Sequence, residues 1–211
     1  MHNKENDLLN KRVNSHLSED ELVSLNMSGT REERRQQFMN MQKNLAEKYK
    51  YNEDTFFENG FVHLRVITPE EIMINNIQPN TVHCFPFFKG NVLFTKNKRG
   101  VDIIGGHIEE NETVVDALYR EAKEESSIIP GEYKLIGAIE VDNKDNPEAI
   151  NQGYPLKGYQ FFYKITEFEL LPFENTHEST DRIFVDIESI PLVHYNWLRS
   201  YQHLLDWAIN K

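Results

Sequence analysis

The feature that most constrains the fold is an amphipathic helical pattern within residues 105–129. Thr113, with Asp116 three residues later, is typical of a helix N-cap with an acid in the first turn. We therefore expect a helix that begins near Val114 and ends at Pro130, because proline stops a helix. Apolar residues recur at helical spacing and predict one buried face. These residues are Val115, Leu118, Tyr119 and Ala122.

The same segment carries a dense cluster of acids, with seven carboxylates between Glu109 and Glu125. At about 100° per residue, Glu121, Glu124 and Glu125 fall on one flank of the expected helix. Like charges three and four residues apart repel each other, so we expect a cation to face them. Carboxylates without accompanying cysteines or paired histidines favour Mg²⁺ or Mn²⁺ over zinc. The alternative is that the helix presents a solvated acidic face.

The order of the other predicted elements indicates an α/β fold. Strand patterns cover residues 61–67, 81–88, 92–95, 101–104, 133–141, 159–165 and 182–186. Thr68 and Pro69 are typical of the start of a short helix, and residues 194–210 predict a final helix. Strands, a helix, more strands and a last helix imply a mixed sheet covered on both faces. The polar segment 142–158 is long for a connection and is a candidate substrate-binding loop.

Composition and charge exclude several classes of protein. The chain has 211 residues, a formal net charge of −11 and a single cysteine. The negative charge argues against non-specific binding to nucleic acid and to an anionic membrane. We find no apolar run long enough to span a membrane and no hydrophobic signal core. A lone cysteine excludes an internal disulfide, so we expect a cytoplasmic protein.

Residues 1–58 differ from the rest and predict an N-terminal helical extension, followed by a domain over 59–211. Two capping-box patterns begin at Ser18 and Thr30, and the second precedes an apolar stripe on a charged segment. The stripe either packs on the main domain or forms a homodimer contact or a lid over the substrate. Its residues are Phe38, Met41, Leu45 and Tyr49.

The spacing of the fixed residues around the expected helix resembles the Nudix box, the signature of the Nudix hydrolase family. Gly106 is followed after five residues by Glu112, and after seven more by the run 120–125. Ser127 and Ile104 stand where the family usually has Gly and Pro. Both departures concern the shape of loops. Ser127 falls at the expected helix C-cap, where left-handed geometry costs a residue other than glycine about 1 kcal/mol.

The resemblance implies both a fold and a reaction. The Nudix fold is an α/β/α sandwich with a mixed sheet, and the box binds divalent cations such as Mg²⁺. Nudix hydrolases cleave a diphosphate linkage, usually in a nucleoside diphosphate joined to another group, by attack of water at phosphorus. Arg120 would hold the glutamates through ion pairs, and Glu112 would be a further ligand or an orienting carboxylate. The metal ligands that the resemblance implies are Glu121, Glu124 and Glu125, together with Glu112.

The general base and the substrate contacts follow less directly from the box. Within it, Glu124 or Glu125 is available as the base, and outside it the candidate is Glu178, just before the last predicted strand. The alternative for Glu178 is an exposed loop acid. Gly106 would let the backbone approach the substrate closely. His107 follows directly and would contact a phosphate, unless it is an ordinary solvated residue.

Two other functions remain open from the sequence. A Nudix-fold module that senses a nucleotide without turnover would use the same fold, although a pure binder does not need acids at every ligand position. Isomerase chemistry, as in isopentenyl diphosphate isomerase, requires a catalytic cysteine in a context that Cys84 lacks. The intact acids favour the hydrolase.

Overall fold

The computed structural model describes residue 30, residues 52–57, 59–174 and 178–210. Residues 51–211 form one compact unit, and the fold below is that of this unit. The helices and the apolar stripe that the sequence predicts before residue 52 lie outside the described residues.

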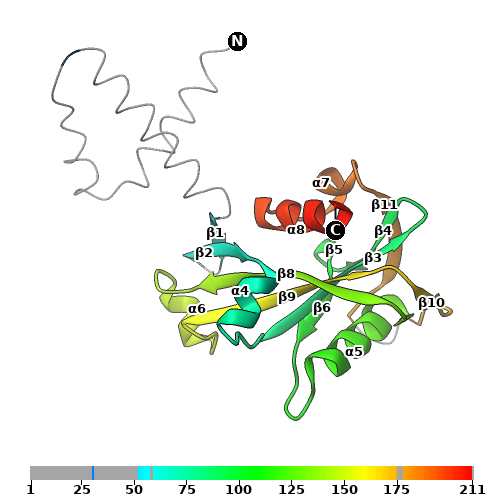
Figure 1. Ribbon diagram of the computed structural model, residues 1–211, viewed down its shortest axis with the longest axis horizontal. Helices are drawn as coiled ribbons and strands as arrows, with labels where there is room; N and C mark the ends of the chain where they lie inside the picture. Colours follow the sequence, from blue (N-terminus) through cyan, green and yellow to red (C-terminus); the bar gives the residue numbers. More distant parts are fainter. Residues whose placement is uncertain (1–29, 31–51, 58, 175–177, 211) are drawn as a thin grey trace. The chain divides into compact units, whose positions relative to one another are not determined.

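A mixed sheet forms the centre of the described chain (Figure 1). Its nine strands are β1 (Asn52–Phe57), β2 (Gly60–Ile67), β3 (Thr81–Phe88), β4 (Asn91–Asn97), β5 (Gly100–Asp102), β6 (Ile104–His107), β8 (Tyr133–Asp142), β9 (Lys157–Ile165) and β11 (Asp181–Asp186). The order is β1-β2-β8-β9-β3-β4-β11, with β5 on β4 and β6 on β3. Strands β3 and β9 run parallel, and the other pairs are antiparallel. A separate small sheet pairs β7 (Ile128–Pro130) with β10 (Phe168–Leu170).

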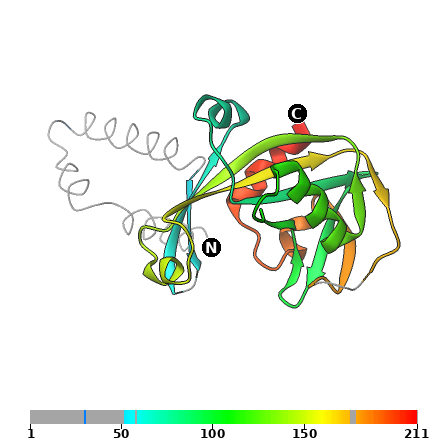
Figure 2. The ribbon, with the colours of Figure 1, turned by 90° about the horizontal axis from the view of Figure 1, so that it is seen from below.

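Helices cover both faces of this sheet, as the sequence predicts. The helices of the unit are α4 (Pro69–Ile74), α5 (Val114–Ser126), α6 (Pro147–Asn151), α7 (Ile190–Val193) and α8 (Arg199–Asn210). Helices α5 and α8 lie on opposite faces (Figures 1 and 2). Neighbouring residues of β9 show the two layers, because Phe161 packs into the core under α5 and Phe162 into the core under α8. This alternation confirms the α/β/α sandwich. Among the described residues, no helix is long and apolar enough to cross a membrane.

Strand β1 lies in the segment for which the sequence predicts helices, and for residues 52–57 that prediction is wrong. The strand pairs along its whole length with β2, from Asn52 opposite Arg65 to Phe57 opposite Gly60. None of its residues is fully buried. An edge strand of this kind is stabilised by pairing and lacks the alternation of buried apolar residues that identifies a strand in sequence.

The helix α5 begins at Val114 as predicted but ends at Ser126, before Pro130. Ser127 adopts the left-handed conformation, with φ 51° and ψ 48°, and the chain continues into β7. The buried face is also rotated from the predicted one, since Val115 is exposed. The buried residues of α5 are Ala117, Leu118, Ala122 and Ser126.

The start of the last helix and the content of one predicted loop also differ from the predictions. The last helix begins at Arg199 and not at His194, because the chain at His194 bridges to Val101 and the Tyr195 N–H donates to the Val101 carbonyl. The predicted loop 142–158 contains the short helix α6.

The left-handed conformation of Ser127 at the C-cap of α5 leads to a testable prediction. Its left-handed backbone costs about 1 kcal/mol relative to glycine, but its hydroxyl accepts a 3.2 Å hydrogen bond from the Glu174 N–H. We expect Ser127→Gly to change the free energy of unfolding little, since it loses a bond worth about 1 kcal/mol while relieving a similar strain. Ser127→Ala keeps the strain and loses the bond, and should be less stable than Ser127→Gly by about 1 kcal/mol. Urea unfolding of the three proteins measures this order, which equal stability of the two variants would contradict.

Candidate active site

The start of α5 is fixed by a complete capping box. The Thr113 hydroxyl accepts from the Asp116 N–H at 3.1 Å, and the Asp116 carboxylate accepts from the Thr113 N–H at 3.2 Å. The buried face of the helix then packs on the sheet through Ala117, Leu118 and Ala122. These two constraints set the rotation of α5, so the acids of its second half emerge on the flank beside β6.

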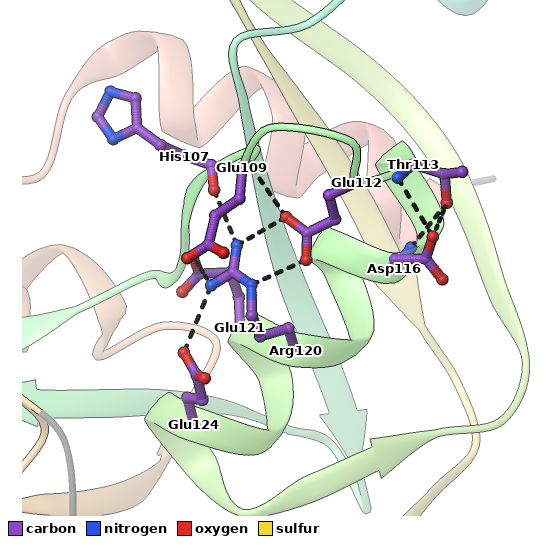
Figure 3. A network of polar contacts seen from close by, with 8 residues as sticks. All are labelled: His107, Glu109, Glu112, Thr113, Asp116, Arg120, Glu121 and Glu124. Carbon is purple, nitrogen blue, oxygen red and sulfur yellow. Dashed lines mark hydrogen bonds and ion pairs between the residues drawn. The ribbon is translucent and has the colours of Figure 1, made fainter.

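One guanidinium group joins three of the glutamates (Figure 3). Arg120 donates through Nε and Nη2 to the two carboxylate oxygens of Glu112, at 2.8 and 3.0 Å. Its Nη1 donates to Glu121 at 2.7 Å and to Glu124 at 3.3 Å. Hydrogen bonds to Glu112 and Glu121 raise the pKa of Arg120 further above its usual value. Arg120 therefore offsets one of the three negative charges that it contacts.

The two glycines in the middle of β6 let carboxylates approach the backbone. The Gly105 N–H donates to Oε2 of Glu125 at 2.8 Å. A Cβ atom on Gly106 would lie 2.7 Å from Cδ of Glu121, closer than van der Waals contact allows. Gly106 is thus required for the observed position of Glu121.

Glu125 is the most enclosed of these carboxylates. Burial raises its pKa to about 8, and the charges of Glu121, Asp102 and Glu178 act in the same direction, while the Gly105 N–H opposes them. Arg120 does not contact Glu125, so this carboxyl group has no positively charged partner among the described ion pairs. A cation beside it would favour the ionised form.

A groove of about 1170 Å³ brings most of the predicted site residues together. Its walls include Gly106, His107, Glu121, Glu124, Glu125 and Glu178. Glu178 is exposed and reaches the groove from the segment before β11. The long segment 142–158 also contributes to the walls, as the sequence suggests for a substrate-binding loop.

The structure places Glu112 and the His107 ring differently from the other candidates. Glu112 is not among the residues that line the groove, and its carboxylate is held by Arg120 and by the Glu109 N–H at 2.9 Å. These contacts favour the orienting role over direct ligation. The His107 carbonyl accepts from Arg120 at 2.9 Å, and its exposed imidazole points away from the carboxylates (Figure 3).

The chemistry of the acids fits a hard divalent cation. Among the described residues, however, no three Asp, Glu, His or Cys side chains are arranged as a ready metal site. The reason is that Glu121 and Glu124 are turned to Arg120, and Glu125 to the Gly105 N–H. Ligation of a metal by these three glutamates therefore requires side-chain rotation, in which Glu121 and Glu124 exchange the guanidinium for the cation.

Sequence reasoning missed His83, which also lines the groove. Its ring stacks on Phe162 with centroids 4.9 Å apart, and its Nε2 lies 3.1 Å from Oγ1 of Thr81. Burial lowers the pKa of His83 to about 4, so the imidazole is neutral at pH 7. The residue lies in a strand outside the box, and only its pairing with Gly105 across β3 and β6 brings it to the site.

Comparisons with known proteins find several solved structures that are similar to this chain. Similar solved structures include the pyrophosphohydrolase BsRppH of Bacillus subtilis, with a TM-score of 0.54, 16% identity, and coverage of 76% of this chain and 96% of that chain. The MutT NUDIX hydrolase from Burkholderia pseudomallei gives a TM-score of 0.47 at 19% identity, covering 62% of this chain and 98% of its own. The NUDIX domain of Shewanella oneidensis NrtR, complexed with ADP ribose, gives a TM-score of 0.43 at 14% identity. The match covers 68% of this chain and 98% of that chain. No curated protein matches the sequence.

The family model of the NUDIX domain matches residues 77–207, which is more than half of the chain. The matched range contains the box at 106–128 and every candidate site residue discussed above. The chain therefore belongs to the Nudix hydrolase family, whose members hydrolyse pyrophosphate bonds.

Proposed function

We propose that the protein is a Mg²⁺-dependent hydrolase that cleaves the diphosphate linkage of a nucleotide-type substrate by attack of water at phosphorus. The observation that carries this proposal is the convergence of Glu121, Glu124 and Glu125 on one groove. A protein that only binds a nucleotide has no need of three acids facing the phosphates, because they repel an anionic ligand unless a cation intervenes.

In this proposal Glu121, Glu124 and Glu125 hold Mg²⁺, with Mn²⁺ as a substitute. The bound metal would supply polarisation of the phosphoryl oxygens and a water molecule of lowered pKa. Arg120 remains anchored through its two bonds to Glu112 when Glu121 and Glu124 turn to the cation. Glu112 is thus a positioning residue. Gly106 presents its backbone close to the phosphates because it has no side chain.

Glu178 is the proposed general base. It comes from a segment outside the box, lines the same groove, and is not one of the acids that Arg120 holds. A carboxylate that is not a metal ligand keeps its basicity, which suits it to accept a proton from the attacking water. Glu124 and Glu125 are the other acids in reach if they do not ligate the metal.

A substrate panel tests the reaction directly. With Mg²⁺, the purified protein should release phosphate-containing products from at least one member of a panel of nucleoside triphosphates, nucleotide sugars, ADP-ribose, dinucleoside polyphosphates and capped RNA. Removal of divalent cations with EDTA should abolish the release, and Mg²⁺ or Mn²⁺ should restore it. Product analysis by ion-exchange chromatography measures both. Binding across the panel without turnover would contradict the hydrolase and favour the sensor.

A further inference from the structure

The groove extends well beyond the carboxylates. Ligand sites typically occupy roughly 300–1,000 Å³, and at about 1170 Å³ this groove is larger than a diphosphate group alone needs. Its far wall is built by β1 and by the segment around α6, which lie side by side in both views (Figures 1 and 2). Phe57, Tyr154 and Pro155 line the groove from these elements. Asn80, just before β3, and Gln160, in β9, also line it.

Two aromatic rings stand at this wall and remain partly exposed. The rings of Phe57 and Tyr154 meet edge to face, with centroids 5.8 Å apart and an interplanar angle of 88°. Phe57 is 41% exposed and Tyr154 is 38% exposed. Both residues line the groove and keep part of their surface open. A flat aromatic ligand that packs on the rings would remove apolar surface from water.

The position of Phe57 is fixed by a buried side chain. Asn146 is fully buried, and its Nδ2 donates to the Phe57 carbonyl at 2.6 Å, while its Oδ1 accepts from the Ala149 N–H at 3.0 Å. Gly60, just after the turn, leaves room for this amide, since a Cβ there would lie 2.8 Å from Cα of Asn146. The end of β1 is thereby attached to the start of α6.

Two further contacts hold the α6 segment in place, one to the sheet and one within the segment itself. His63 of β2 hydrogen-bonds Asp54 of β1 through Nδ1 and Asp145 through Nε2, both at 2.6 Å. Within the segment, the buried Asn143, before α6, donates through Nδ2 to the carbonyl of Pro155, after α6, at 2.7 Å. The aromatic wall is therefore preformed, and a ligand does not have to order it.

Polar groups next to the rings suit a ligand with hydrogen-bonding edges. The Asn80 side-chain oxygen accepts from the Tyr159 N–H at 2.8 Å, and its backbone N–H donates to the Tyr159 carbonyl at 2.8 Å. These bonds fix the amide and leave its nitrogen to donate to a ligand. Gln160, on the adjacent position of β9, lines the same wall.

We propose that Phe57 and Tyr154 form a subsite for the nucleobase of the substrate, with the diphosphate lying at the carboxylate end of the groove. This inference rests on the proposed function and narrows it to substrates that carry a planar aromatic group. Phe57 precedes the range of the NUDIX family match, so the chain builds this subsite partly from its own upstream strand.

The test compares two ligands that are not hydrolysed at the bridging position. α,β-Methylene-ADP carries the base, and methylenediphosphonate has the same phosphorus backbone without it. With saturating Mg²⁺, isothermal titration calorimetry should show tighter binding of the nucleotide to the unaltered protein. Tyr154→Ala and Phe57→Ala should each weaken nucleotide binding about 10-fold, leaving methylenediphosphonate unchanged, whereas Tyr154→Phe should keep the ring and the affinity.

Phe56→Ala is the matched control for the strand. Phe56 precedes Phe57 in β1, is 63% exposed, and is not among the groove residues. Its loss should leave both affinities unchanged. Equal effects of Phe56→Ala and Phe57→Ala, or equal binding of both ligands to the unaltered protein, would overturn the subsite, as would binding of neither. If the base-dependent difference holds but no nucleotide is hydrolysed, the proposed function fails while the subsite stands.

Discussion

Glu124→Gln is expected to reduce kcat about 100- to 1,000-fold while leaving the fold intact. A neutral amide is a weaker ligand for Mg²⁺ than a carboxylate and offsets less of its charge. The cost to stability should be small, because Glu124 is partly exposed and its contact with Arg120 is the longest of that network, at 3.3 Å. Such surface ion pairs contribute about 1 kcal/mol or less.

Initial rates over a Mg²⁺ titration measure this effect, with thermal unfolding run in parallel. The matched control is Glu110→Gln, which removes an exposed acid of the loop before α5 that does not line the groove. Its rate and Mg²⁺ dependence should equal those of the unaltered enzyme. If Glu124→Gln turned over substrate at the normal rate, Glu124 would not be a ligand in the proposed metal site.

Gly106→Ala should lower kcat/KM about 100-fold. The added methyl carbon would lie 2.7 Å from Cδ of Glu121, so either the carboxylate or the backbone of β6 has to move. Displacement of a catalytic group by about 1 Å is enough for a loss of this size. Because the backbone at Gly106 does not have a positive φ, the effect arises from the collision and not from conformational strain.

The control for this substitution is Gly131→Ala. Gly131 also lacks a positive φ and lies outside the groove, and its nearest contact for a Cβ would be the Glu167 carbonyl at 3.1 Å. It should change stability slightly and activity not at all. Normal activity of Gly106→Ala would mean that neither Glu121 nor the substrate needs the space beside Gly106 during turnover.

The parts of the site that the sequence predicts are those built from neighbouring residues. Thr113 and Asp116 determine the start of α5 through a local capping box, and helical spacing alone places Glu121, Glu124 and Glu125 on one flank. The end of α5 was less predictable, because Ser127 takes a backbone conformation that the sequence does not specify for serine.

The far wall of the groove depends on contacts between distant segments. The sequence indicates its 142–158 segment but not the strand β1 beside it. The bond from Asn146 to the Phe57 carbonyl joins residues 89 positions apart. Likewise, His83 reaches the groove only because β3 pairs with β6. Periodicity and capping patterns do not indicate such contacts. The sequence therefore predicted neither β1 nor the position of Phe57 at the groove.

Arg120 gives the acidic groove a counterion that belongs to the chain itself. Its ion pairs with Glu112, Glu121 and Glu124 place a positive charge beside these carboxylates without a bound metal. The protein is thus expected to reach its native state in metal-depleted solution. Binding and release of the cation then only exchange Arg120 for the metal as the partner of Glu121 and Glu124, while the fold stays unchanged.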